Sequence, residues 1–278
     1  MIELFHRVSE QCSRLVTEQY STSFSSAIRL LHKDLRAPVF NIYGFVRLAD
    51  EIVDTFHDYD KRALLEEFKK QTWQAIDRGI SCNPVLNSFQ LTVNRYGIDP
   101  QLIEAFFGSM EMDLARQVYD EEKYGQYIYG SAEVVGLMCL CVFCEGNKEL
   151  YQQLEAPARS LGAAFQKVNF LRDIRADYNG MSRIYFPCCD FNNFTTEKKQ
   201  QIEADIQQDF RHACTGIVRL PLKARFGVYV AYKYYLSLFK KIKQMQPASV
   251  LQQRIRIPNY RKMMILARAG VKNQLRLI

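Results

Sequence analysis

Turn-forming residues are scarce in this sequence, which holds 13 glycines and 8 prolines among 278 residues. Hydrophobic residues make up 48% of the chain, and no stretch shows the strict apolar–polar alternation of an all-β protein. The apolar content excludes a disordered or fibrous protein, and the scarcity of turn signals excludes an all-β one. We therefore expect an all-α protein that folds as one domain over residues 1–278.

Long hydrophobic runs are also lacking. The longest, Val134–Cys144, is interrupted by Gly136 and is shorter than the roughly 20 residues that cross a bilayer. Residues 1–7 have no basic start followed by an apolar stretch and a cleavage site, as a secretory signal would. We therefore expect a cytoplasmic protein without a transmembrane helix, whose 8 cysteines are reduced. Their spacing completes no four-ligand zinc site.

Acidic residues are absent after Asp209. Residues 210–278 hold 15 Lys and Arg, a net charge of +15, whereas residues 1–209 hold the other 22 Lys and Arg against all 30 Asp and Glu, a net charge of −8. Such a tail suits nucleic acid, anionic lipid or phosphorylated small molecules, or it is only a solvated basic face. No nucleic-acid-binding motif accompanies it, so we expect no nucleic-acid partner.

Glycine and proline punctuate the chain at intervals of helical length. Asn83-Pro84 and Asp99-Pro100 are pairs suited to the N-cap and first position of a helix. We expect Pro38 and Pro157 to mark helix ends, and residues 178–196 to form one long loop.

One expected helix, residues 43–54, collects polar side chains on one side. At 100° per residue, Tyr43, Arg47, Asp50 and Asp54 fall within about 60° of one another. The apolar residues Phe45, Leu48 and Ile52 gather on the opposite side.

A second expected helix, residues 166–177, repeats this arrangement. Gln166, Asn169, Asp173 and Asp177 fall within about 80° of one another, with apolar residues on the far side. Both helices therefore carry two Asp four residues apart, and each has an Arg one to three residues before its first Asp.

Two like charges at this spacing destabilise an isolated helix. A single such pair is usually a solvated face, but two pairs with Arg and amide neighbours favour another explanation. Facing carboxylates become favourable when divalent cations lie between them, and Mg²⁺ prefers oxygen ligands shared with substrate phosphates. The pattern therefore predicts an Mg²⁺–diphosphate site, with Arg neutralising the diphosphate. The 4 histidines are scattered singly and indicate no hydrolytic metal site.

Several segments, taken in this order and spacing, resemble the squalene and phytoene synthase family of head-to-head prenyl transferases. They are Tyr20-Ser21-Thr22-Ser23-Phe24, the stretch from Arg47 to Asp54, the stretch from Tyr127 to Gly136, the stretch from Asn169 to Asp177, and Arg183-Ile184-Tyr185-Phe186-Pro187. The whole chain is most similar to bacterial phytoene synthases. The resemblance implies an isoprenoid synthase fold, with helices around a central cavity.

Carried onto the matching positions, the resemblance implies a set of site residues. Asp50, Asp54, Asp173 and Asp177 would hold Mg²⁺, with Mn²⁺ as an alternative ion, and Asn169 would be a further ligand. Arg47 and Arg172 would act on the diphosphates. The expected substrate contacts are Ser21, Ser23, Tyr43, Gln166, Tyr235 and Arg254, with Lys262 as a weaker candidate.

Three positions depart from the family pattern. Glu51 stands where Asp is common, and it points about 100° away from the polar stripe, so we expect little effect. Glu133 replaces a small residue and is expected to alter the local shape of the cavity. Arg175 lies between two motif aspartates and can pair with one of them.

The implied activity is condensation of two geranylgeranyl diphosphates to phytoene through a cyclopropyl diphosphate, as in carotenoid biosynthesis. The alternatives are dehydrosqualene or squalene synthesis from farnesyl diphosphate, and a non-catalytic member that binds prenyl lipid. Aromatic faces would protect the cationic intermediates, and Phe24, Phe40, Phe45, Phe165, Phe170 and the run from Tyr229 to Tyr235 are candidates. Because the hydrocarbon product leaves slowly into water, we also expect peripheral membrane association, with the basic C-terminal third near anionic headgroups. A downstream carotenoid desaturase is an expected partner.

Overall fold

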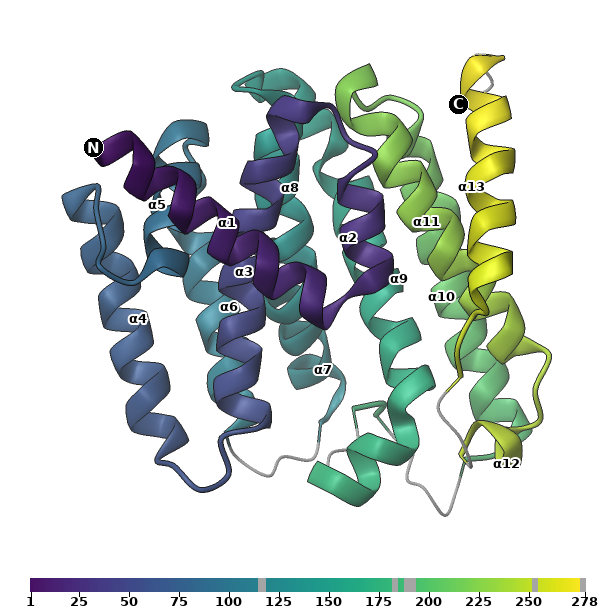
Figure 1. The fold of residues 1–278 in the computed structure, drawn as a ribbon. Helices are drawn as coiled ribbons and strands as arrows, with labels where there is room; N and C mark the ends of the chain where they lie inside the picture. Colours follow the sequence, from purple (N-terminus) through teal and green to yellow (C-terminus); the bar gives the residue numbers. More distant parts are fainter. Residues whose placement is uncertain (115–118, 182–184, 188–193, 252–254, 276–278) are drawn as a thin grey trace.

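A computed structural model of the chain describes residues 1–114, 119–181, 185–187, 194–251 and 255–275, and, within these, all side chains except those of residues 175–181. These residues form helices and no strand, as the composition predicts (Figure 1). Most of the long helices run up or down the molecule, and α1 crosses diagonally in front of α3. The elements are α1 (Ile2–Tyr20), α2 (Thr22–Ile28), α3 (Lys33–Asp54), α4 (Lys61–Arg78), α5 (Pro84–Tyr96), α6 (Pro100–Asp113), α7 (Glu121–Ile128), the π-helix η1 (Tyr129–Glu133), α8 (Val134–Cys144), α9 (Lys148–Met181), α10 (Thr196–Ile217), α11 (Leu222–Lys243), α12 (Pro247–Val250) and α13 (Asn259–Gln274).

The starts of α5 and α6 follow local sequence chemistry. The Asn83 side chain accepts hydrogen bonds from the backbone N–H groups of Val85 and Leu86, at 3.0 and 3.4 Å. Asp99 caps α6 in the same way, and each cap is followed by a proline at the first helical position. These caps satisfy N–H groups that have no partner within the helix, so both predicted boundaries are confirmed.

The expected helix ends at Pro38 and Pro157 are wrong, because both prolines lie inside helices, in α3 and α9. A proline in a helix interior loses one backbone hydrogen bond, and tertiary packing has to compensate. Pro157 packs closely against α10: a Cβ placed on Gly216 would lie only 2.4 Å from the Pro157 Cβ. In addition, α9 continues to Met181, so the first residues of the expected loop are helical.

The apolar run Val134–Cys144 is part of a longer continuous helical segment in the structure. The helical run Glu121–Cys144 extends through α7, η1 and α8 over 24 residues, with a mean hydropathy of 1.7 in its most apolar window. By length and composition alone this helix could cross a membrane. However, 56% of that window is buried inside the molecule, where η1 and α8 pack against α6 and α9, as a core helix does.

The buried apolar side chains form two clusters. One is centred on α3, α5, α6 and α8, where Phe45 stacks on Phe89 with ring centroids 3.8 Å apart. The other joins α9, α10 and α11, and Phe210 and Phe239 are fully buried in it. The helices of both clusters contribute to the wall of one cavity, which includes five of the expected site residues.

Candidate active site

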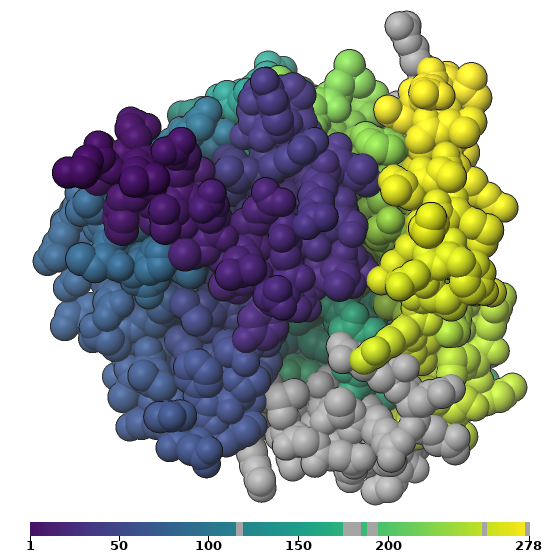
Figure 2. Space-filling model, viewed as in Figure 1, coloured from purple at the N-terminus to yellow at the C-terminus, as the bar shows by residue number. Residues whose placement is uncertain are grey.

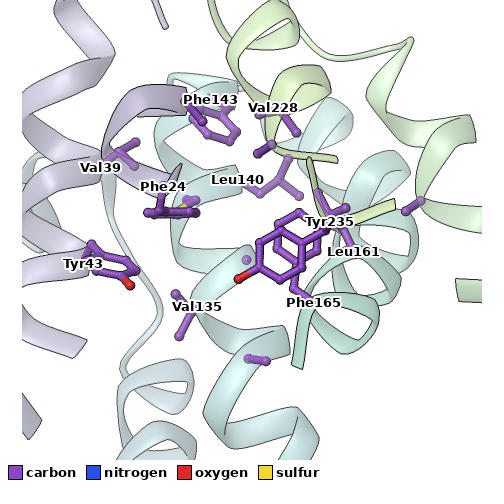
Figure 3. Close-up of a pocket in the computed structure, with 18 of the residues that line it drawn as sticks. Phe24, Val39, Tyr43, Val135, Leu140, Phe143, Leu161, Phe165, Val228 and Tyr235 are labelled. Atoms are coloured by element: carbon purple, nitrogen blue, oxygen red, sulfur yellow. The ribbon is translucent and has the colours of Figure 1, made fainter. Parts of the chain in front are cut away.

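The cavity has a volume of about 260 Å³ and is lined mainly by apolar side chains from α2, α3, α8, α9, α10 and α11, together with η1 (Figure 3). Along α3 its wall passes from Val39 through Tyr43 to Asp50, and along α9 from Leu154 to Asn169. The polar groups thus follow the apolar ones on both helices. The cavity is an apolar pocket with a polar end, a shape suited to an amphiphilic ligand.

On α3, Asp50 and Arg47 are close to each other, with Arg47 Nη1 3.8 Å from Asp50 Oδ2. A second Arg47 nitrogen donates to Glu51, and the guanidinium lies 4.3 Å from the ring centroid of Tyr20. Arg47 is therefore held on three sides. Its Nε is buried and has no hydrogen-bond partner among the described residues.

The carboxyl group of Asp50 is in an environment that disfavours its charge. Burial, together with the neighbouring charge of Asp54, raises the pKa of Asp50 to about 8, although Arg47 lowers it. The side chain is 32% exposed, but the exposed part lies on the wall of a mostly apolar cavity, where a charge is poorly hydrated. A bound cation would favour the ionised form.

On α9, the amide groups of Gln166 and Asn169 line the same cavity. Asn169 donates to the Gln166 side-chain oxygen at 3.4 Å, and Gln166 donates to Ser131 at 3.3 Å. The Asn169 Oδ1 atom is buried without a hydrogen-bond partner in the described part of the chain. Such an oxygen is costly to leave unsatisfied, and it is a neutral ligand of the kind that hard cations accept.

One turn further along α9, Asp173 pairs with its neighbour Arg172. The Arg172 Nε atom lies 3.0 Å from each oxygen of the Asp173 carboxylate. Each acidic motif therefore carries its own arginine counter-ion, Arg47 on α3 and Arg172 on α9.

The structure thus brings five of the sequence-predicted site residues to the lining of one cavity: Tyr43, Asp50, Gln166, Asn169 and Tyr235. Asp54, Arg47, Arg172 and Asp173 belong to the same two helices but do not contribute to this wall. Ser21 caps α2, accepting from the Phe24 N–H at 3.3 Å, and Ser23 lies in the first turn of that helix. Lys262 is on α13, where burial lowers its pKa. The Asp177 and Arg175 side chains and all of Arg254 lie outside the described residues.

Two stacked aromatic pairs flank the cavity. Phe24 stacks on Tyr43 at 4.6 Å between centroids, and Phe165 stacks on Tyr235 at 3.9 Å. Figure 3 shows the two pairs on different sides of the cavity, from α2 and α3 on one side and from α9 and α11 on the other. Burial, with the nearby Tyr235 and Asp50, raises the pKa of Tyr43 to about 12, so its hydroxyl remains a proton donor. Of the other expected aromatics, Phe40 and Phe45 are core residues.

Sequence reasoning missed Asp113, which is 8% exposed at the end of α6. Tyr127 donates a hydrogen bond of 2.7 Å to its carboxylate, and the charge of Asp113 contributes to the raised pKa of Asp50. Tyr127 also lies in an aromatic cluster with Phe170 and Tyr185. Asp113 has no second Asp four residues away in the sequence, so only its position in the fold reveals it.

The structure shows what two of the three residues that depart from the family pattern, Glu133 and Glu51, contact. Glu133 pairs with Arg159 at 2.6 Å and does not line the cavity, so its side chain does not narrow the pocket. Glu51 contacts Arg47, so it has a closer relation to the site than its helical phase indicates.

The chemistry of Asp50 and Asn169 fits Mg²⁺. Asp50 and Asn169 offer a carboxylate and an unpartnered amide oxygen that both line the cavity. Among the described side chains no three His, Cys, Asp or Glu come together in a metal-binding group. Mg²⁺ commonly binds through one or two carboxylates, with the remaining positions taken by water and substrate phosphates, so a smaller carboxylate set suffices.

The overall fold is that of the isoprenoid synthases. A solved dehydrosqualene synthase with a bound ligand superposes on this chain with a TM-score of 0.80, covering 97% of this chain and 98% of that one at 19% identity.

The chain belongs to the squalene/phytoene synthase family, whose model matches residues 17–261. It is 27% identical to a phytoene synthase of Arthrospira platensis, over 95% of this chain and 93% of that protein. It is 25% identical to the 4,4'-diapophytoene synthase of Staphylococcus haemolyticus, over 70% of this chain and 67% of that protein. Members of this family are prenyltransferase-type synthases, which supports an enzymatic role.

Proposed function

We propose that this protein condenses two molecules of geranylgeranyl diphosphate head to head to form phytoene. The observation that carries the proposal is the cavity itself: an apolar pocket with Asp50 and the unpartnered Asn169 oxygen on its wall. The apolar part suits a prenyl chain, and the polar end suits a metal-bound diphosphate. The similarity to phytoene synthases over nearly the full chain agrees with this substrate class.

The polar end would bind and neutralise the diphosphates. Asp50, Asp54, Asn169, Asp173 and Asp177 are the residues that would hold Mg²⁺. When bound, this ion supplies a Lewis acid that stabilises the charge on the departing diphosphate. In this structure Arg47 and Arg172 pair with the neighbouring carboxylates of Asp50 and Asp173. Once cations bind these carboxylates, both arginines would turn toward the diphosphate oxygens.

The proposed reaction begins when the C1–oxygen bond of one substrate breaks and diphosphate leaves. The 2,3 double bond of the second substrate forms a bond to the resulting cation, and loss of a proton closes the cyclopropane. A second diphosphate leaves, the skeleton rearranges, and loss of a second proton yields the hydrocarbon. Two diphosphates and two protons are thus released, with no net oxidation or reduction.

The cavity wall would protect the cations from nucleophiles. Phe24 and Phe165 present aromatic rings, whose negative faces stabilise positive charge. Burial raises the pKa of Cys139 on this wall to about 12, so it is a neutral thiol and a weak nucleophile.

A second candidate function is the same condensation with farnesyl diphosphate, giving dehydrosqualene. It is favoured by the superposition with a dehydrosqualene synthase and by the similarity to a 4,4'-diapophytoene synthase. Squalene would additionally require a reductant at the last step.

The decisive experiment incubates the purified chain with Mg²⁺ and an equimolar mixture of farnesyl and geranylgeranyl diphosphates. Diphosphate release is measured, and the hydrocarbons are identified by mass spectrometry. Phytoene as the main product supports the first proposal, and a 30-carbon hydrocarbon supports the second. EDTA, Asp50→Ala and Asp173→Ala should each abolish release.

The matched control is Glu145→Gln, which disrupts an exposed ion pair with Lys223 at 2.9 Å, away from the cavity. It should leave both readouts unchanged. If wild-type protein binds prenyl diphosphate but releases no diphosphate with Mg²⁺, the chain is a non-catalytic binder and both proposals are wrong.

A further inference from the structure

The last helix, α13, has two apolar faces. Its inner face, with Ile265, Leu266 and Ala269, packs into the second core cluster. Its outer face carries Tyr260, Met264, Ala267 and Val271, which fall within about 60° of one another at 100° per residue. Tyr260, Met264 and Val271 are 59%, 46% and 56% exposed. Figure 2 shows α13 as a yellow ridge along one edge of the molecule, uncovered in this view.

Two further apolar side chains widen this outer stripe. Met263 and Leu275 flank it on either side and are 71% and 62% exposed. A water-exposed row of large apolar residues along four turns is unusual for a protein surface, and it indicates that something covers it.

A basic row runs beside the stripe. Arg261, Arg268 and Lys272 are exposed and lie about 100° around the helix from the centre of the stripe. With Lys262, they give residues 259–274 a charge of +4, and this helix contains no Asp or Glu. An exposed apolar stripe bordered by cations on one side is the composition of helices that lie in the interface of an anionic bilayer.

The first helix provides an internal comparison. Leu4 and Leu15 of α1 are as exposed as the α13 residues, at 55% and 58%. However, residues 2–20 hold two Arg against three Glu, a net charge of −1. An anionic surface would therefore attract α13 and not α1, and Figure 1 shows the two helices on opposite sides of the molecule.

We propose that the outer face of α13 is the surface by which this protein docks on an anionic lipid bilayer, with the helix lying along the membrane plane. The apolar stripe enters the boundary between headgroups and acyl chains, and the basic row contacts lipid phosphates. Docking goes beyond the proposed reaction and does not require it.

Docking through α13 would bring the cavity close to the bilayer. The helix packs on α11, and α11 contributes Val228, Ala231 and Tyr235 to the cavity wall. Two packed helices, α13 and α11, would therefore separate the bilayer from the cavity, with their axes about 8–10 Å apart.

The test is flotation of the full chain with vesicles of phosphatidylcholine, with or without phosphatidylglycerol, and without substrate. The wild-type protein should bind the anionic vesicles and not the neutral ones. Removing the two charges in Arg268→Gln/Lys272→Gln should weaken binding about 25-fold, at about fivefold for each basic residue. Met264→Ser/Val271→Ser should weaken it about tenfold through lost apolar burial.

The control is Leu4→Ser/Leu15→Ser on α1, which removes similar apolar surface and should leave vesicle binding unchanged. All substituted side chains are exposed, and circular dichroism confirms that each variant is folded. Equal binding of wild type and both α13 variants would overturn the proposal. So would an α13 variant that dissociates a dimer of this chain while vesicle binding stays the same, because a second copy would then be the occupant. Failure of the diphosphate-release assay leaves this readout unaffected.

Discussion

Replacing Glu51 by Gln tests whether Arg47 depends on its partners to serve the diphosphate end of the cavity. Glu51 accepts a hydrogen bond from Arg47, and their side chains are 17% and 22% exposed, so the pair is only partly screened by water. Hydrogen bonds to charged groups contribute about 1.5–3 kcal/mol, and glutamine keeps the hydrogen bond but loses the charge. Losing the charge should therefore weaken transition-state stabilisation by about 1 kcal/mol, which corresponds to about a fivefold decrease in kcat/KM.

The assay is steady-state diphosphate release with Mg²⁺, measured together with the thermal unfolding midpoint. Tyr20 should act in the same direction: its ring lies 4.3 Å from the guanidinium, so Tyr20→Leu removes a cation–π contact that Tyr20→Phe retains. The reasoning is refuted if Glu51→Gln lowers the unfolding midpoint while kcat/KM stays at the wild-type value, because Glu51 would then stabilise only the helix. Glu145→Gln, in a pair whose side chains are both 44% exposed, is the control and should change neither quantity.

Three further predictions address the charge, the packing and the buried hydrogen bonds of the site. The pKa of Asp50 is about 8 in the folded protein and near 3.9 in the unfolded chain. Between these two pH values the folded metal-free protein holds a proton that the unfolded chain has lost. The free energy of unfolding should therefore decrease as pH rises from about 4 to about 8. Chemical denaturation in EDTA should show this slope in the wild type and a flatter one in Asp50→Asn, and equal slopes would contradict the assigned environment. A Cβ on Gly162 would lie 2.6 Å from the Ala132 carbonyl oxygen, so Gly162→Ala should lower the free energy of unfolding, measured by urea titration, by about 1–3 kcal/mol. The control is Gly108→Ala, which has open space around it and should be neutral or stabilising in the same titration. Tyr127→Phe removes the 2.7 Å hydrogen bond to buried Asp113 and should cost about 1–3 kcal/mol; an unchanged urea midpoint would show that this bond contributes nothing.

Local chemistry alone determined several features of this protein. The Asn83 and Asp99 caps depend on a side-chain oxygen within three residues of the N–H groups it accepts, so they can be read directly from the chain. The polar stripes of α3 and α9 follow from helical periodicity in the same way. Their repetition, with the other quoted motifs, also predicted the family, which the family model confirms.

Other features arise from contacts between distant segments, and no local signal reports them. Proline usually ends a helix, but Pro157 stays inside α9, where Gly216 of α10 packs against it. The raised pKa of Asp50 depends on burial and on the charges around it, including that of Asp113 on α6, and neither appears in the spacing of a motif.

The two apolar faces of α13 show the same division. The sequence alone establishes that this helix is basic and contains apolar residues at helical spacing. Only packing against α11 decides which of those residues are buried and which face outward, because one periodic pattern permits either face to be the inner one. Likewise, the sequence specifies two acidic helices, but the tertiary structure alone places Asp50 and Asn169 on the wall of one cavity, since that requires residues more than a hundred positions apart to share a single space.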